Sequence, residues 1–304
     1  MSTDDQLAAE RQQAPRAAIA ALVAALAIVA SAVIRLLALQ DAPAASFVEA
    51  LGRVEAGPIG DLPSLHAPAF EYFVDRFPLL LLSSVTGAIG AIGVGLALAF
   101  LAHATRARRP QFPRLGTTLP LVGGVLLAVG GVLTEIGTHQ ILSDIVDGRP
   151  TVDSVGEASR PLLLNAGQIL GGGAGIPGVA TFAVAGAYVL VSLNAMRVGL
   201  LTRFMGVLGI LIGITLVLQI IPGPVQLIWL IALGALFLGR WPGGVPPAWR
   251  TGNAEPWPTN AEIRAAREAA AAERRAPASA PDDLPERPST PHPASKKRKR
   301  KRRG

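Results

Sequence analysis

Long apolar segments separated by polar loops are the dominant pattern along this chain. A helix needs about 20 apolar residues to cross the roughly 30 Å hydrocarbon core of a bilayer. Four segments reach that length, and two more lie near the lower limit of about 17 residues. The predicted spans are residues 17–39, 78–102, 115–137, 170–193, 204–221 and 224–240. The pattern therefore predicts an all-α integral membrane bundle of six transmembrane helices.

Two glycine- and proline-rich stretches interrupt this pattern. Ile221–Pro224 separates the last two spans and removes two backbone donors, which predicts a tight helical hairpin. Gly171–Gly175 lies at the start of the fourth span. A phosphate-binding loop would continue with Lys and then Ser or Thr, whereas Ile176, Pro177 and Gly178 follow here. We interpret the stretch as a broken helix start, with ligand binding as the alternative.

The loops between the predicted spans alternate in charge. Residues 104–114, after the second span, contain four arginines and no acid. The loops after the first and third spans are acidic. Basic residues near the ends of spans are retained in the cytoplasm. The charges therefore predict a multi-pass protein of the bacterial cytoplasmic membrane with both termini cytoplasmic, including an N-terminal segment over residues 1–16.

A cleaved signal peptide is the alternative interpretation of the first apolar segment, because Ala42-Pro43-Ala44 resembles a cleavage site. However, this segment is longer than the roughly 7–15 residues of a signal core. Arg35 also interrupts its far end, and the residues before it are not consistently basic. We therefore favour an uncleaved membrane anchor.

Small residues recur at helical spacing within the spans. Such stripes allow another backbone to approach closely. The stripes are Gly87, Ala91 and Gly95 in the second span; Gly123, Gly130 and Gly137 in the third; and Gly206, Gly209 and Gly213 in the fifth. We interpret them as sites of tight packing within one bundle. A homo-oligomer formed through these faces is the alternative.

Polar residues of the spans gather near the predicted external end. This candidate external polar cluster consists of Arg35, Glu135, His139, Asn165, Gln168 and Gln219. Arg35 and Glu135 each lie about 30 Å from the cytoplasmic starts of their helices, and His139 is one turn beyond Glu135. We favour an Arg35–Glu135 pair at the membrane interface. The alternative is a shallow external cavity or a cation site.

Two further patterns precede the second span. Ser46 and Glu49 have capping-box spacing, which predicts an amphipathic helix over Ser46–Ala56. A face shared by three aromatic residues consists of Phe70, Phe73 and Phe77. We interpret both patterns as interfacial anchoring and loop packing, with a lid over a substrate as the alternative.

Composition and residue placement limit the possible chemistry. The chain has no cysteine, which excludes thiol nucleophiles and thiolate metal sites. The span interiors contain no aspartate for an intramembrane aspartyl protease, and no serine and histidine lie at comparable depth. His66 and His139 are the only external histidines, and they have no diagnostic metal spacing. We therefore expect a non-enzymatic protein without a metal or cofactor.

The chain becomes polar after Trp241. Trp241, Trp249 and Trp257 suit an aromatic belt, which predicts a juxtamembrane strap on the cytoplasmic face. A short solvated helix to about Arg275 completes this region, residues 241–275.

Residues 276–304 are rich in Pro and Ala and then strongly basic, which predicts a disordered tail. Its basic cluster consists of Lys296, Lys297, Arg298, Lys299, Arg300, Lys301, Arg302 and Arg303. These eight cations exceed the net charge of +7 of the whole chain. Anionic lipid and nucleic acid both attract such a cluster. We favour lipid, because Trp241 places the start of this region beside the bilayer.

Two segments, LLTRFMGVLG over residues 200–209 and LGRWPGG over residues 238–244, resemble uncharacterised, chiefly actinobacterial, multi-span membrane proteins of unknown function. The resemblance implies a six-helix fold and no catalytic residues. We expect a structural or regulatory membrane component whose basic tail binds lipid or a partner. The alternative is a small-solute or ion transporter that uses the external polar cluster.

Overall fold

The computed structural model describes residues 2–43, 66–148, 175–218, 223–242, 244–257 and 260–275. Within these residues the regular secondary structure is entirely helical. The chain divides into two units, Met1–Trp257 and Pro258–Gly304. The predicted helix over residues 46–56 and the glycines at 171–174 lie outside the described residues.

Apolar helices make up most of the first unit. They are α1 (Thr3–Leu39), α4 (Phe77–Arg108), α5 (Arg114–Asp147), α7 (Gly175–Arg197), α8 (Arg203–Val217) and α9 (Gly223–Phe237). The short helix α3 (Ala67–Asp75) precedes α4, and α10 (Pro247–Thr251) follows α9. Four helices, α1, α4, α5 and α7, are long and apolar enough to cross a membrane. They indicate a membrane protein. The apolar helices α8 and α9 are shorter, at 15 residues each.

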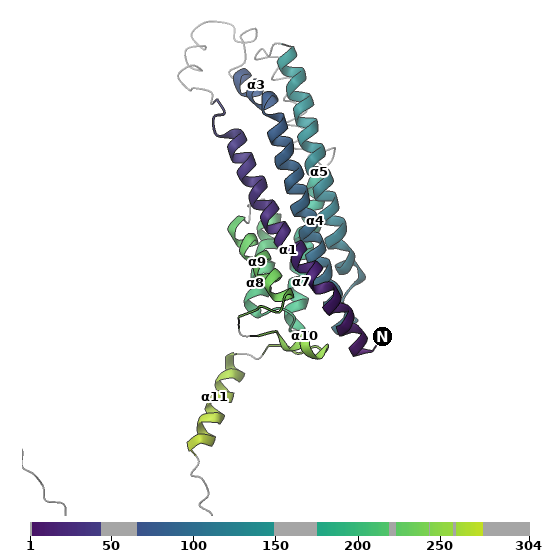
Figure 1. The fold of residues 1–304 in the computed structure, drawn as a ribbon, viewed down its shortest axis with the longest axis vertical. Helices are drawn as coiled ribbons and strands as arrows, with labels where there is room; N and C mark the ends of the chain where they lie inside the picture. Colours follow the sequence, from purple (N-terminus) through teal and green to yellow (C-terminus); the bar gives the residue numbers. More distant parts are fainter. Residues whose placement is uncertain are drawn as a thin grey trace, which may run out of the picture. The chain divides into compact units, whose positions relative to one another are not determined.

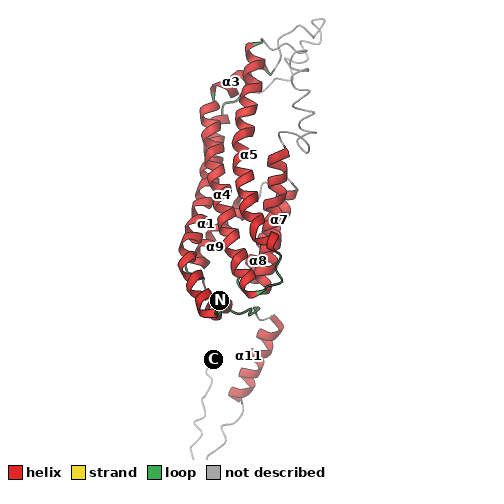
Figure 2. Cartoon of the chain, turned by 90° about the vertical axis from the view of Figure 1, so that its right-hand side faces the viewer, coloured by secondary structure: helices red, strands yellow, loops and turns green. Residues whose placement is uncertain are grey.

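Neighbouring helices of the first unit form a closed ring in the order α1, α4, α5, α7, α8 and α9. Successive helices of the ring alternate in direction, and α7, α8 and α9 pack beside one part of the longer α1, α4 and α5 (Figures 1 and 2). The start of α1, the loops at 109–113 and 198–202, and the strap at 239–257 meet at one end, here the basal end. The opposite end, with α3 and the end of α5, is the distal end.

Helix α1 begins at Thr3, well before the predicted span, and it continues through Pro15. A capping box starts it: the Ser2 hydroxyl accepts from the Asp5 N–H, and the Asp5 carboxylate accepts from the Ser2 N–H, both at 3.1 Å. These bonds to Ser2 lower the pKa of the Asp5 carboxyl. The start of α1 is thereby held helical although Pro15 removes one of its backbone donors.

Close helix contacts occur where the stripes of small residues predict them. A Cβ added at Gly93 of α4 would lie 2.7 Å from the carbonyl oxygen of Ala20 in α1, so only glycine fits there. At Gly95 the same atom would lie 2.7 Å from the carbonyl oxygen of Pro120 in α5. The stripe in α8 faces α7, where a Cβ added at Gly213 would lie 2.7 Å from the carbonyl oxygen of Ala185. The interpretation of tight packing within one bundle is confirmed at Gly95 and Gly213, whereas Gly93 lies outside the predicted stripes and Gly137 of the third stripe has no such contact with the described residues.

The packed core lies mainly in the basal half of the bundle. Its largest fully buried side chains include Tyr188, Trp229 and Phe112, and alanines of α1 and α4 pack around them. By contrast, a Cβ added at Gly137 of α5, in the distal half, would meet no atom of the described residues within 4 Å. The two halves therefore differ in packing.

The outward faces of the long helices carry large apolar side chains. Leu26 of α1 is 71% exposed, and Leu133 of α5 is 54% exposed. Exposed apolar surface of this kind is typical of helices that contact lipid. In the second unit, α11 (Asn260–Arg275) confirms the predicted short helix to Arg275.

Candidate functional site

The structure brings Arg35 and Glu135 together at the distal end. The Arg35 Nη1 atom lies 3.1 Å from the Glu135 Oε2 atom, which joins α1 to α5 across the face of α4. The Arg35 side chain is 51% exposed and that of Glu135 is 14% exposed. The predicted ion pair is therefore confirmed, and it is a partly solvated one.

His139 lies one turn beyond Glu135 on α5 and packs flat against Phe77 at the start of α4. The two ring centroids are 3.7 Å apart and the rings are inclined by 11°. The Nδ1 atom of His139 is buried and has no hydrogen-bond partner among the described residues. His139 thus contributes to helix packing and also presents one unsatisfied polar atom.

A cavity of about 230 Å³ lies beside this ion pair. Its wall includes Arg35, Glu135, His139, Thr138, Phe70, Phe73, Phe77, Leu80 and Leu142. The three phenylalanines were predicted to serve in interfacial anchoring and loop packing. The structure places them in the wall of this cavity, where α3 packs against α5 and α4.

The other members of the predicted cluster are Asn165, Gln168 and Gln219, and they lie outside the described residues, as does the basic cluster 296–303. Over the part of the chain that is described, no group of three His, Cys, Asp or Glu side chains is placed so that it could hold a metal ion.

A second ion pair, absent from the sequence predictions, lies at the basal end. Arg108 at the end of α4 binds Glu10 of α1 through two parallel bonds, Nη1 to Oε1 at 2.7 Å and Nη2 to Oε2 at 2.8 Å. The Arg108 side chain is completely buried, and that of Glu10 is 12% exposed. Such a bidentate pair fixes geometry as well as charge.

The remaining donors of Arg108 bind backbone carbonyl groups. Its Nε and Nη2 atoms donate to the Ala248 oxygen at 3.0 and 2.8 Å, and its Nη1 atom donates to the Ala104 oxygen at 2.9 Å. Together with Glu10, these acceptors satisfy all five N–H groups of the guanidinium. Arg108 therefore ties α1, α4 and the strap into one unit.

Trp249 of the strap packs beside this guanidinium. Its ring lies 5.3 Å from the Arg108 Cζ atom and is nearly parallel to the Phe100 ring at 5.8 Å. Its Nε1 atom donates to the Leu200 carbonyl oxygen at 3.0 Å. Trp249 was predicted to belong to an aromatic belt and a juxtamembrane strap. In the structure it lies in the strap and is half-buried, because Phe100, Phe237 and Leu200 supply apolar contacts and an acceptor.

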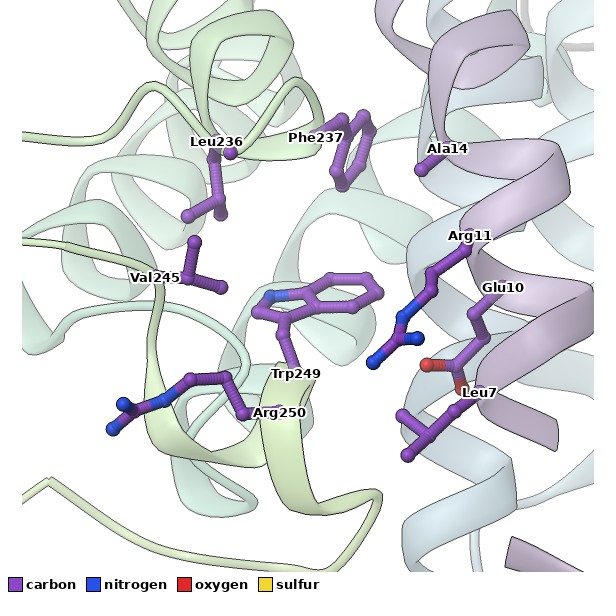
Figure 3. Close-up of a pocket in the computed structure, with 10 residues that line it drawn as sticks. Leu7, Glu10, Arg11, Ala14, Leu236, Phe237, Val245, Trp249 and Arg250 are labelled. Atoms are coloured by element: carbon purple, nitrogen blue, oxygen red, sulfur yellow. The ribbon is translucent and has the colours of Figure 1, made fainter. Parts of the chain in front are cut away.

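A basal cavity of about 240 Å³ opens between α1, the end of α9 and the strap. Figure 3 shows Trp249 at its centre, with Phe237 and Leu236 on one side and Arg11 and Glu10 on the other. Sequence analysis missed this site because each of its charged residues resembled an ordinary loop charge. The Ser2–Asp5 capping pattern was the available signal, since it extends α1 down to the strap.

The two ends of the first unit carry opposite net charge. Among the described residues, the basal end has ten arginines against four carboxylates, and the distal end has two arginines against six carboxylates. The basal residues are Arg11, Arg16, Arg106, Arg108, Arg109, Arg114, Arg197, Arg203, Arg240 and Arg250, with Asp4, Asp5, Glu10 and Glu255. The distal residues are Arg35 and Arg76, with Asp41, Glu71, Asp75, Glu135, Asp144 and Asp147.

Comparison with protein-family models, with curated proteins and with solved structures gives no match to this chain. The functional argument therefore rests on the fold and its charges: an apolar helical bundle with a basic basal end, an acidic distal end and a cavity at each.

Proposed function

We propose that this chain is a non-enzymatic structural or regulatory component of a bacterial cytoplasmic membrane, with six spans, both termini in the cytoplasm, and a basic tail that binds anionic lipid. The opposite charge of the two ends is the observation that carries this proposal. Arginines near span ends are retained in the cytoplasm, so the arginine-rich basal end faces inward. The resemblance to actinobacterial multi-span proteins is consistent with this class.

Six spans require that the short helices α8 and α9 also cross the bilayer. Gly234 of α9 packs against Leu22 and Ala18 of α1, which sets the level of its basal end. From Gly234 back to Gly223 the helix rises about 16 Å, which brings the start of α9 to the level of Ser31. Arg35 lies about 6 Å further. Helix α9 therefore reaches close to the outer boundary, where modest thinning of the bilayer accommodates it.

Hydrogen bonds between helices support a structural or regulatory role. Ser31 and Ser83 each donate to the backbone oxygen of the other, at 2.8 and 3.0 Å, and so join α1 to α4. The Gln226 amide donates to the Tyr188 hydroxyl at 3.1 Å and joins α9 to α7. Residues 17–34 of α1 and 78–102 of α4 contain no ionisable side chain. Polar groups here hold helices together, whereas a transport path would require polar groups facing a channel.

The distal cavity favours one alternative function, a small-solute or ion transporter. Arg35, Glu135 and His139 border this cavity, and ionisable residues near a membrane often mark a substrate site. Purified protein in sealed vesicles separates the two functions. The structural or regulatory proposal predicts no solute or ion flux above that of protein-free vesicles. A flux that the Glu135→Gln variant loses would contradict this proposal and support the transporter.

Cysteine labelling tests the proposed topology, because the natural chain has no cysteine. Cysteine is introduced singly at four exposed positions. Gln111→Cys and Ala254→Cys lie at the basal end, and Asp41→Cys and Asp147→Cys lie at the distal end. A membrane-impermeant maleimide applied to intact spheroplasts is expected to label only the distal pair, and all four after permeabilisation. Labelling of Gln111→Cys in intact spheroplasts would contradict the proposed orientation.

The tail is tested with a spin label at Ser295→Cys on the full chain in vesicles. Anionic lipids are expected to slow the label, and raised salt is expected to free it, because each cation near an anionic surface contributes up to about 1 kcal/mol. The control replaces all eight basic residues of 296–303 with Gln. Equal mobility in anionic and in phosphatidylcholine vesicles would contradict lipid binding by the tail.

A further inference from the structure

We propose that the basal cavity between α1, the end of α9 and the strap binds one anionic phospholipid of the cytoplasmic leaflet, with Arg11 and Arg250 as the cations on its rim that attract the anionic headgroup and the apolar wall along its acyl chains. This site is separate from the basic tail. Its assignment to the cytoplasmic leaflet rests on the proposed orientation, whereas its preference for an anionic phospholipid does not.

The wall of the cavity is apolar on one side. Leu236 and Phe237 come from the last turn of α9, Val245 and Trp249 come from the strap, and Ala14 faces them from α1 (Figure 3). The volume of about 240 Å³ suits part of a glycerolipid, and its open side admits longer chains. The indole N–H of Trp249 already donates to Leu200, so this ring presents apolar surface to an occupant.

The charge of the cavity is positive because its carboxylate is already neutralised. Both oxygens of Glu10 accept hydrogen bonds from Arg108, which lies buried behind the wall. Arg11 and Arg250 border the same cavity, and both are exposed. Within the described part of the chain, neither makes a side-chain hydrogen bond or an ion pair. Two cations thus remain available for an anion.

The height of the cavity matches the headgroup layer. Arg11 precedes the start of the apolar part of α1 at Ala17 by six residues, or about 9 Å of helix. A bilayer about 40–45 Å thick around a core of about 30 Å has a headgroup layer of about 5–7.5 Å on each side. The Arg11 backbone therefore lies at the outer edge of this layer, its long side chain covers the remaining distance to the phosphates, and the apolar residues of α9 lie near the hydrocarbon boundary. A phospholipid has this order of chemistry, whereas a soluble phosphate would use only the cations.

The experiment titrates short-chain phosphatidylglycerol into the full chain in neutral detergent and follows its thermal unfolding, because a ligand of the folded state raises apparent stability. The eight basic residues of 296–303 are replaced by Gln throughout, which removes the tail as a competing site. Arg11→Gln and Arg250→Gln are each expected to weaken the apparent affinity about fivefold. Arg203→Gln is the matched control, because Arg203 is an exposed basal arginine outside the cavity.

Three outcomes overturn this proposal. Unchanged affinity in both Arg11→Gln and Arg250→Gln would remove the site. Equal stabilisation by short-chain phosphatidylcholine would remove its preference for an anion. Equal stabilisation by inorganic phosphate or glycerol phosphate would assign the cavity to a soluble phosphate instead of a lipid. None of these outcomes alters the mobility of the label at Ser295→Cys, so failure here is distinguishable from failure of the proposed tail function.

Discussion

The two ends of the bundle each contain an arginine–glutamate pair between α1 and another long helix, but the two pairs differ in almost every physical respect. Glu10 and Arg108 are 98 residues apart in sequence, and Arg35 and Glu135 are 100 residues apart. The basal pair is bidentate around a fully buried guanidinium, whereas the distal pair makes one bond from an arginine that is half-exposed. Sequence separation and residue type are matched, so burial and hydrogen bonding distinguish the two pairs.

The difference in burial indicates which of the two ion pairs contributes more to the stability of the fold. A partly solvated ion pair contributes little, with a median of about 0–1 kcal/mol. Removing one partner of a buried pair leaves an uncompensated charge in the interior and costs about 3–5 kcal/mol. We therefore expect the basal end to behave as the rigid end of the molecule, and the distal end as the end that tolerates change.

The largest effect is expected for Glu10→Gln. It leaves the buried Arg108 without an anion, so the free energy of unfolding should fall by about 3–5 kcal/mol. Denaturant unfolding of the full chain in mild detergent measures it. Arg16→Gln, which removes an exposed charge from the same end of the bundle, is the control and should change stability by less than about 0.5 kcal/mol. Similar losses in both variants would show that Arg108 is not locked by Glu10.

Glycine substitutions extend the comparison to the two halves of the bundle. Gly93→Ala in the basal half places a Cβ 2.7 Å from the Ala20 carbonyl oxygen, so α1 must move away from α4. The expected loss is about 1–3 kcal/mol. Gly137→Ala in the distal half has open space around it and is expected to be neutral or to stabilise the helix by up to about 1 kcal/mol. Equal losses by thermal unfolding would contradict the difference in packing.

Trp249→Phe isolates the hydrogen bond that joins the strap to the loop before α8. The phenyl ring keeps the aromatic contacts with Phe100 and Phe237, but the Leu200 carbonyl oxygen loses its donor. We expect a loss of about 1 kcal/mol. A matched test is Trp249→Ala, which also removes the packing and should cost at least twice as much. If both variants lose the same amount, the ring contacts contribute nothing.

The smallest effect is expected for Glu135→Gln at the distal end, with a loss below about 1 kcal/mol. The competing interpretation is a cation held by Glu135 and His139. It predicts that divalent metal raises the thermal midpoint of the natural chain and that a chelator lowers it. We expect no response to either addition. A metal response lost in both Glu135→Gln and His139→Ala would establish a cation site there.

Hydrophobic length and periodicity predicted the helical architecture well. The starts of α4 and α5 lie within one residue of the predicted spans, because an apolar run ends where polar groups must meet water. The Arg35–Glu135 pair was predictable because both residues interrupt apolar helices at the same depth. The basal Glu10–Arg108 pair was not predictable from the sequence. Arg108 is one of four arginines in a basic stretch, and its burial depends on Glu10 and on Ala248, which is 140 residues away.

The sequence pattern also could not show that Trp241 and Trp249 have different surroundings. Trp241 and Trp249 follow the last apolar helix at similar sites in the sequence, and only tertiary structure places the Trp249 ring between Phe100 and Arg108. The start of α1 at Thr3 was not predictable from local sequence alone, because Pro15 disfavours a helical conformation at the residue before it. Contacts of the first turns with the strap, such as Thr3 beside Gly252, support this extension.

Paired double-mutant cycles test the central claim most directly. One cycle combines Glu10→Gln with Arg108→Gln, the other combines Glu135→Gln with Arg35→Gln, and all variants are unfolded under the same detergent conditions. The coupling free energy isolates each pair from the separate effects of its members. A buried bidentate pair and a half-exposed single bond predict a basal coupling of more than about 2 kcal/mol and a distal coupling below about 1 kcal/mol. Equal couplings, or a larger distal coupling, would contradict the account of a locked basal end.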